Sequence, residues 1–266
     1  KRIGGINFDC ACFLNLKQDH LDYHKTIDNY FRTKASIFTG ESGSAPKNAV
    51  VNIDDPYGRK LTTMIPSQTK LVSFGIESSD DIVRAENIKM LPQKSVFKLV
   101  YPEGETEITL NMPGHYNILN ALAALSIVYT QDFNLKDAAL ALAQFSGVPG
   151  RMQKVSGSPK FDIFVDYAHT NDALRNGLSM LKNIVKGRIL VVFGCGGKRD
   201  RTKRPLMVQA VQDFADIAWA TSDNPRGEPL EQIFADMKTG VKHPEKICFI
   251  EDRRRAINLA IEAAGE

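Results

Sequence analysis

Arg188-Ile-Leu-Val-Val-Phe193 is an apolar run that ends in Gly194-Cys-Gly-Gly197 and leads into a basic loop, Lys198-Arg-Asp-Arg-Thr-Lys-Arg204. A second apolar run, at residues 217–220, leads into the turn Thr221-Ser-Asp-Asn-Pro-Arg-Gly-Glu228. Both runs have the length and composition of buried strands, and ligands of open α/β sheets bind where such strands end. Arginine side chains placed there can grip a carboxylate through two hydrogen bonds. The stretch therefore predicts a site for a small charged substrate.

Strands and helices alternate on both sides of this stretch. The predicted strand and helix pairs are 162–165 with 172–184, 189–193 with 206–214, 217–220 with 230–237, and 246–250 with 253–264. Successive β-α units of this length predict a parallel, doubly wound sheet. Gly147-Val-Pro-Gly150 interrupts the chain just before them, so we expect two domains, residues 1–148 and 149–266.

The first of these domains has a mixed α/β pattern. Thr26 is the predicted N-cap of a helix that extends to Phe38, and Asp54-Asp-Pro-Tyr-Gly58 has the composition of a turn. The other predicted elements are strands at 48–53, 71–74, 96–100 and 107–110 and helices at 117–129 and 135–145.

The composition is that of an ordinary globular protein, with 266 residues, 43% hydrophobic and 24% charged. A net charge of +3 gives no reason to expect a nucleic-acid or membrane partner. The four cysteines show no metal-finger spacing, which favours a reduced cytosolic protein. Since the chain has neither a signal-peptide pattern nor an apolar run of about 18 residues, we expect a cytoplasmic protein, and a monomer.

Several polar motifs have both a functional and a structural interpretation. His20 and His24 have the spacing of a metal-binding pair, but loop histidines are also commonly solvated. Lys34, on the buried side of its helix, has the pattern of a lysine whose amine extends to water. Asn117, near a helix start, is a candidate cap. Asp166 follows a strand, where it can receive ribose hydroxyls or cap the next helix.

The two loops that open this section also have alternatives. Gly194–Gly197 lacks the third glycine of the dinucleotide motif, so a nicotinamide-dependent oxidoreductase is only weakly indicated. The basic loop 198–204 carries five Lys or Arg in seven residues, a composition that a nucleic-acid-binding module can also have. It contains no aromatic residue for base stacking, which favours a solvated loop.

Eight segments of the chain, taken together, resemble the Mur ligases, ATP-dependent ligases of peptidoglycan synthesis. The segments are Asn15-Leu16 with Asp19–His24, Lys34-Ala35, Asn52–Gly58, Gly114–Ala124, Pro149–Met152, Val165–Thr170, Gly194–Gly197 with Lys203–Pro205, and Asp223–Arg226. The resemblance implies the remainder of a central ATPase domain followed by a Rossmann-like C-terminal domain. It is greatest to the branch that adds the third residue of the UDP-N-acetylmuramoyl peptide.

The resemblance assigns roles to residues of the first domain. Arg2 matches an arginine associated with the muramoyl substrate, and His20 matches a magnesium ligand. Lys34 matches a lysine that carbon dioxide carbamylates, giving an anionic ligand for a second Mg²⁺; the reaction requires a neutral amine, which burial favours. Asn117 and Asn120 match the region that contacts adenine.

In the second domain the implied roles concern ATP and an amino acid. Arg151, Asp166 and His169 match positions that meet the ribose and phosphates of ATP, and Arg199 matches a residue that grips the incoming amino acid. Asp223-Asn224-Pro225-Arg226 accompanies meso-diaminopimelate in the family, because the arginine pairs with a distal carboxylate that L-lysine lacks. A buried arginine without that carboxylate would be an unpaired charge costing several kcal/mol; a plain turn is the alternative.

The resemblance thus implies an ATP-dependent ligase that joins meso-diaminopimelate to UDP-N-acetylmuramoyl-L-alanyl-D-glutamate through an acyl phosphate. Addition of L-lysine is the alternative within the family. The phosphate-binding Gly-x-x-Gly-Lys-Thr loop, the UDP-binding domain and a final C-terminal motif do not occur in the sequence. We therefore expect a fragment somewhat longer than half a ligase, inactive by itself.

Overall fold

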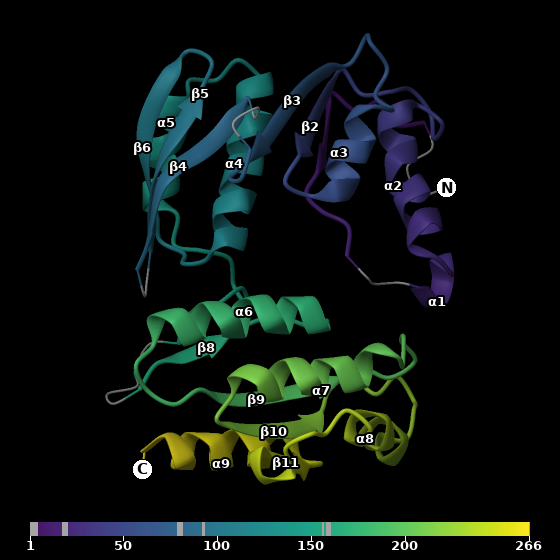
Figure 1. Cartoon of the computed structure of the whole chain (residues 1–266), viewed down its shortest axis with the longest axis vertical. Helices are drawn as coiled ribbons and strands as arrows, with labels where there is room; N and C mark the ends of the chain where they lie inside the picture. Colours follow the sequence, from purple (N-terminus) through teal and green to yellow (C-terminus); the bar gives the residue numbers. More distant parts are fainter. Residues whose placement is uncertain are drawn as a thin grey trace. The chain divides into compact units, whose positions relative to one another are not determined.

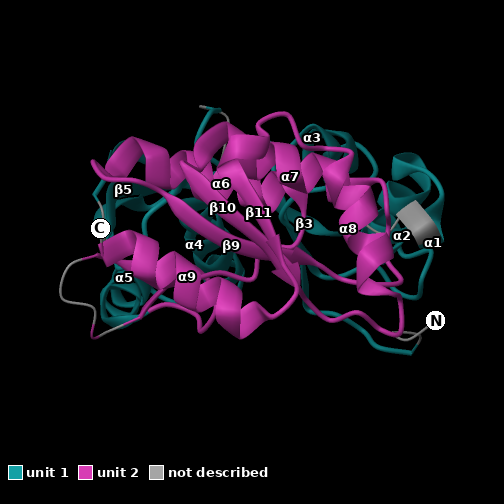
Figure 2. Ribbon diagram, turned by 90° about the horizontal axis from the view of Figure 1, so that it is seen from below, with its two compact units in different colours: residues 1–146 teal, residues 147–266 magenta. Residues whose placement is uncertain are grey.

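The computed structural model describes residues 5–17, 21–78, 82–91, 94–155, 157 and 161–265. The chain divides into two compact units, Lys1–Ser146 and Gly147–Glu266 (Figure 2). The functional division after residue 148 stays a prediction.

The first unit is built on a mixed sheet in which the strands follow one another in chain order. They are β1 (Cys10–Phe13), β2 (Asn48–Asn52), β3 (Lys70–Gly75), β4 (Val83–Met90), β5 (Ser95–Tyr101) and β6 (Gly104–Leu110). β1 to β4 pair in parallel, whereas β4, β5 and β6 pair antiparallel. The helices are α1 (Leu21–His24), α2 (Ile27–Thr39), α3 (Pro56–Thr62), α4 (His115–Thr130) and α5 (Leu135–Gln144).

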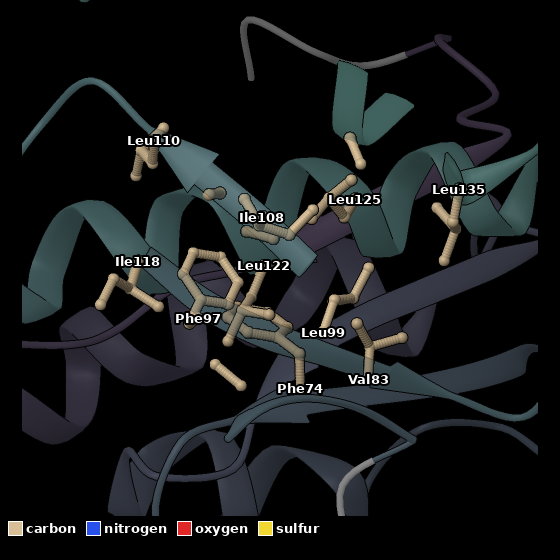
Figure 3. Close-up of a cluster of buried hydrophobic side chains, with 14 of the residues drawn as sticks. Phe74, Val83, Phe97, Leu99, Ile108, Leu110, Ile118, Leu122, Leu125 and Leu135 are labelled. Carbon is tan, nitrogen blue, oxygen red and sulfur yellow. The ribbon is translucent and has the colours of Figure 1, made fainter. Parts of the chain in front are cut away.

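Apolar side chains cover both faces of the parallel part of this sheet. In β2, Val50 packs into the cluster formed with α4, whereas Ala49 and Val51 pack into the cluster that contains Phe31 and Phe38 of α2. This alternation follows from the two-residue period of a strand. Figure 3 shows the first cluster, in which phenylalanine and leucine side chains of the sheet meet those of α4 and α5. Its labelled members are Phe74, Val83, Phe97, Leu99, Ile108, Leu110, Ile118, Leu122, Leu125 and Leu135.

The second unit contains a parallel sheet in the order β9 (Leu190–Cys195), β10 (Ile217–Ser222) and β11 (Ile247–Ile250). Its helices are α6 (Asn171–Ile184), α7 (Lys203–Phe214), α8 (Leu230–Lys238) and α9 (Arg253–Gly265), with a short 3₁₀ turn at Pro244–Lys246. Within this unit α6 and α7 lie on one face of the sheet and α9 on the other (Figures 1 and 2). This arrangement is the predicted α/β architecture with helices on both faces.

One predicted strand lies elsewhere than expected. Residues 163–165 form β8, which pairs antiparallel with β7 (Gln153–Val155) and does not join the parallel sheet. The apolar run Ile163-Phe164-Val165 is short, and its last side chain is 48% exposed, so it lacks the burial of a central parallel strand. The prediction that this run begins the parallel sheet was wrong.

Other differences concern elements that the sequence pattern did not reveal. β1 and β4 were not predicted, and the turn predicted at Asp54–Gly58 is the start of α3. There Asp55 accepts hydrogen bonds from the N–H groups of Tyr57 and Gly58, and Pro56 occupies the first turn. These are helix-starting residues as well as turn residues. In the part of the chain that the structure describes, no helix is long and apolar enough to span a membrane.

Candidate functional site

The two turns that open the sequence analysis lie side by side at the carboxyl edge of the second unit's sheet. β9 and β10 pair in parallel from Leu190 and Ile217 onward, so both end at the same edge. Beyond the strands, the N–H of Gly197 donates a hydrogen bond of 2.9 Å to the carbonyl oxygen of Asn224. The two turns therefore meet at the sheet edge where the sequence predicts a site, and the site itself stays a prediction.

The glycines of Gly194–Gly197 permit this close approach. A Cβ atom at Gly194 would lie 2.5 Å from the carbonyl oxygen of Thr221, and one at Gly196 would lie 2.6 Å from a guanidinium nitrogen of Arg226. A Cβ at Gly197 would overlap the carbonyl of Pro225. Packing of one turn against the other thus accounts for Gly194 and Gly197, which face backbone carbonyl groups, without a dinucleotide phosphate; at Gly196 the flexible Arg226 side chain could move aside.

Arg226 lies on the outside of its turn. Its φ of 49° is in the left-handed region, and the side chain is exposed. One guanidinium nitrogen lies 3.3 Å from the carbonyl oxygen of Gly197 and 3.4 Å from that of Asn224. Asp223 is also exposed. The premise that Arg226 is buried was wrong. Because its guanidinium group is exposed to water, leaving it without a carboxylate partner costs little free energy. Its pairing with a substrate carboxylate stays a prediction.

The basic loop contains arginines in two different environments. Arg199 is exposed, and it forms no ion pair with a carboxylate of the described residues. Arg201 binds Asp236 of α8 through two bonds of 2.7 Å. Arg204, in the first turn of α7, is completely buried. Part of the basic loop therefore forms ion pairs within the protein and is not available to a ligand.

The guanidinium of Arg204 lies between two carboxylates. It donates to both carboxylate oxygens of Glu228, at 2.7 and 2.8 Å, and to Asp236 at 2.7 Å. Glu228 also accepts the N–H of Lys198 at 2.7 Å. These bonds, first those from Arg204, lower the pKa of Glu228 to about 2.

The sequence interpretation missed Arg204 and Glu228. A signal was available: Arg204 lies in the first turn of α7, and Glu228 closes the turn that contains Arg226. Residue type by itself did not distinguish a buried arginine from the exposed ones around it.

The structure brings Arg151, Asp166 and His169 of the second unit together. Asp166 accepts hydrogen bonds of 2.8 Å from the N–H groups of Met152 and Ala168, which ties the segment after Gly150 to the end of β8. Tyr167 lies between the other two side chains, with its ring 4.7 Å from the Arg151 guanidinium carbon and 5.1 Å from the His169 ring.

Asp166 does not cap the following helix. The N-cap of α6 is Thr170, whose side chain accepts the N–H of Ala173 at 3.2 Å. The capping alternative for Asp166 was therefore wrong. Tyr167, which is 62% exposed, received no role from the sequence, although it lies within a segment that carries the resemblance.

In the first unit, Lys34 is half-buried on α2. Its amine lies 5.1 Å from the centre of the Tyr30 ring, and His24 stacks on the same ring at 4.6 Å. Burial lowers the pKa of Lys34 below its ordinary value. Among the described residues no carboxylate forms an ion pair with Lys34. This environment favours the neutral amine that carbamylation requires.

Asn117 and Asn120 lie in the first turns of α4. Asn117 is buried, and its amide donates 2.7 Å to the carbonyl oxygen of Pro113; Asn120 is exposed. The helix begins after Gly114, whose φ of 104° is available mainly to glycine. Asn117 is thus not the N-cap, and that alternative was wrong.

Arg2, His20 and the neighbouring Asp19 lie outside the described residues. Among the residues that the structure describes, no group of three or more His, Cys, Asp and Glu side chains is arranged to hold a metal. The described protein side chains alone therefore build no complete metal site.

Two family profiles match successive parts of the chain. One, described as the Mur ligase middle domain, matches residues 1–128, and the other, described as the Mur ligase glutamate ligase domain, matches residues 150–266. Together they extend over nearly the whole sequence.

Curated relatives of the chain are ligases of the same family. The chain is 41% identical to a UDP-N-acetylmuramoyl-L-alanyl-D-glutamate–2,6-diaminopimelate ligase from Geobacillus thermodenitrificans, covering 100% of this chain and 55% of that protein. A protein of the same name from Clostridium botulinum is 40% identical, with 100% and 53% covered. The chain thus spans about half the length of the curated relatives it matches.

Solved structures support the fold. A ligase structure with the same name is 37% identical, with a TM-score of 0.63, and covers 98% of this chain and 53% of that one. Folylpolyglutamate synthase from Mycobacterium tuberculosis has the same fold, with a TM-score of 0.78 at 21% identity, covering 98% and 58%. The chain belongs to the Mur ligase family, and it comprises the middle and glutamate ligase domains of that family.

Proposed function

We propose that this protein acts in an ATP-dependent ligase that adds meso-diaminopimelate to UDP-N-acetylmuramoyl-L-alanyl-D-glutamate in peptidoglycan synthesis. The observation that carries the proposal is the pair of packed turns at the carboxyl edge of the second sheet, with Arg199 and Arg226 exposed there. Identity of 41% to a ligase of that name supports the same substrate.

In this proposal the turns form the amino-acid pocket. Diaminopimelate carries a carboxylate at each end, and two exposed arginines on neighbouring turns offer separate partners for the two carboxylates. Asp223 offers a negative charge for an ammonium group of the same substrate, and Asn224 and Pro225 shape the turn. L-Lysine would leave one arginine without its partner, which disfavours it by the lost charge-assisted hydrogen bonds.

The proposal assigns two groups of residues to ATP binding. Arg151, Asp166 and His169 are grouped on one surface, where a cation, a hydroxyl acceptor and an imidazole suit the phosphates and ribose. Asn117 and Asn120 would contact adenine, with Asn117 fixed by its bond to Pro113. The exposed amide of Asn120 is the one able to hydrogen bond a base.

Lys34 would be carbamylated and, together with His20, would hold Mg²⁺ beside phosphate oxygens and water. The lowered pKa of Lys34 and the absence of an ion-pair partner among the described residues fit the first requirement. When bound, the metal supplies positive charge for the transferring phosphoryl group. In the presence of ¹³C-bicarbonate, NMR of the wild-type protein should show a carbamate carbon resonance that Lys34→Met lacks; its presence in both would contradict this assignment.

The proposed reaction has two steps. The γ-phosphoryl group of ATP passes to the glutamate side-chain carboxylate, which gives an acyl phosphate and ADP. An amine of diaminopimelate then attacks the acyl carbon, the amide bond forms, phosphate leaves and the amine releases a proton. Arg199 and Arg226 would orient the attacking amine by holding the carboxylates of the same molecule.

The test uses the protein encoded by the complete gene with the UDP-muramoyl dipeptide, ATP and magnesium. Phosphate release is followed with meso-diaminopimelate, with L-lysine and with no amino acid. Release only with diaminopimelate supports the proposal, and release with lysine would keep the family but refute the pocket argument. Release with neither would refute the ligase function. We further propose that the protein acts in the bacterial cytoplasm and as a monomer.

A further inference from the structure

The buried arginine of the basic loop contacts both turns of the proposed amino-acid pocket. Arg204 donates to the carbonyl oxygen of Gly196 at 3.3 Å and, on the same guanidinium, binds both oxygens of Glu228. Glu228 in turn accepts the N–H of Lys198. Gly196 and Lys198 are the two neighbours of Gly197, so one arginine–carboxylate pair grips the glycine loop on both sides of that residue.

The same pair is continuous with the second turn. The N–H of Glu228 donates 2.8 Å to the carbonyl oxygen of Pro225, and the N–H of Gly197 donates to Asn224. The chain from Arg204 through Glu228 therefore connects the loop that carries Arg199 to the turn that carries Arg226. Arg199 follows Lys198 directly, and Arg226 lies two residues before Glu228, so both exposed arginines are attached to this connection. Arg226 also donates a long bond of 3.3 Å to the carbonyl oxygen of Gly197.

The pair is electrostatically balanced inside the protein. Arg204 is completely buried, and the side chain of Glu228 is 13% exposed. Asp236 adds a second carboxylate and Arg201 a second guanidinium, so two positive charges face two negative ones. Buried charged groups joined by bidentate bonds hold their geometry more rigidly than exposed pairs. A rigid connection is needed where two arginines must match the fixed spacing of two carboxylates.

We propose that Arg204 and Glu228 are positioning residues that set the spacing between Arg199 and Arg226, and thereby the fit of a substrate with a carboxylate at each end. This inference rests on the proposed function of the pocket. We expect the Arg204–Glu228 pair to affect the binding of the amino acid and not the binding of ATP. The reason is that the hydrogen bonds of the pair reach the glycine loop and the Asn224–Arg226 turn.

The test compares Glu228→Gln and Arg204→Lys with wild type in the complete enzyme. Both variants keep the size of the side chain but lose the bidentate pair. We expect KM for meso-diaminopimelate to rise about ten-fold or more, while KM for ATP and for the UDP-muramoyl dipeptide stays within about two-fold. Glu228→Asp, which keeps the charge, should recover part of the loss. Equal changes in all three constants, or an unchanged KM for diaminopimelate, would overturn the inference.

Arg201→Met is the matched control. Arg201 binds the same Asp236, but in the described residues it donates to neither Gly196 nor Glu228. Its variant should leave KM for diaminopimelate within about two-fold of wild type, as a merely stabilising ion pair would; a rise equal to that of Glu228→Gln would contradict a specific positioning role.

A second measurement can be made on variants that are too unstable for kinetic analysis. Hydrogen exchange of the Lys198 amide reports directly on its bond to Glu228, and this amide should exchange faster in Glu228→Gln than in wild type. Unchanged exchange would overturn the inference even where kinetics cannot be measured. A wild-type enzyme that uses neither amino acid refutes the proposed function and this inference together. An active wild type with unaltered variants refutes the inference alone.

Discussion

The arginines of residues 199–226 form two groups with opposite surroundings. Arg201 and Arg204 are held by the carboxylates of Asp236 and Glu228, and Arg204 is completely buried. Arg199 and Arg226 are exposed, and among the described residues neither has an ion-pair partner. One short stretch of sequence thus contains arginines that hold the protein together and arginines that are available to a ligand. The predictions below separate these two roles, ranked by their effect on the stability of the second unit.

Arg204→Met should have the largest effect. Removal of one partner leaves Glu228 and Asp236 facing each other with reduced compensation, which costs about 3–5 kcal/mol for a buried pair. The free energy of unfolding is measured in urea by the fluorescence of Trp219, the single tryptophan of the sequence, which lies in β10.

Arg175→Met is the control for this loss. Arg175 pairs with Asp213 at 2.7 Å, but both side chains are more than 40% exposed. An exposed pair contributes up to about 1 kcal/mol, so this variant should unfold close to wild type. Equal losses from Arg204→Met and Arg175→Met would contradict the distinction between the two groups.

Gly197→Ala should destabilise the second unit by roughly 2–3 kcal/mol, because the new Cβ would overlap the Pro225 carbonyl and push the turns apart. The measurement is again urea unfolding at Trp219. Gly187→Ala is matched to it, since a Cβ there would meet nothing within 4 Å. A Gly197 variant as stable as the Gly187 variant would show that the turns are not in close contact.

Glu228 should make the second unit sensitive to acid. Its pKa falls from 4.5 to about 2 on folding, so the folded state binds fewer protons than the unfolded state in this range. The stability that Glu228 contributes is complete above pH 4.5 and is lost as the pH falls toward about 2. The pKa of Asp236 is also lowered, mainly by its hydrogen bonds to Arg201. Its contribution to the free energy of unfolding is therefore also lost as the pH falls.

Unfolding free energies measured between pH 6 and pH 2.5 check this. Glu228→Gln should be less stable at neutral pH, and the difference from wild type should shrink as the solution becomes acidic. The same series for Glu231→Gln, at an exposed position on α8, is the control. A difference that stays constant with pH would contradict the ionised pair.

The sequence predicted those features that depend on local pattern. Thr26 caps α2 by accepting the N–H of Asn29, as its position before an amphipathic run indicates. The alternation of strands and helices after Gly150 also holds from α6 onward. These elements follow from periodicity and capping, which are properties of neighbouring residues.

Features that depend on tertiary partners were not predictable in this way. The run at β8 is apolar enough for a parallel strand, but nothing in it specifies β7 as its partner. The glycines after β9 resemble a phosphate loop, whereas their contacts are with the neighbouring turn. Arg204 and Arg226 are the same residue type in the same region, but only Arg204 pairs with the carboxylates of Glu228 and Asp236, which lie 24 and 32 residues away in the sequence. The roles predicted for Arg2 and His20 stay predictions.

Arg226→Ala should have the smallest effect on stability and a large effect on substrate choice. Because Arg226 is exposed and makes only long bonds to two carbonyl oxygens, its loss should change the free energy of unfolding by about 0.5 kcal/mol or less. A charge-assisted pair with the distal carboxylate of diaminopimelate contributes roughly 1.5–3 kcal/mol. Since about 1.4 kcal/mol corresponds to ten-fold, kcat/KM for diaminopimelate in the complete enzyme should fall about ten- to hundred-fold. The weak use of L-lysine should change little, because lysine has no carboxylate at that end. Equal losses with both amino acids would show that Arg226 supports the turn rather than the substrate, and would move it from the second group of arginines to the first.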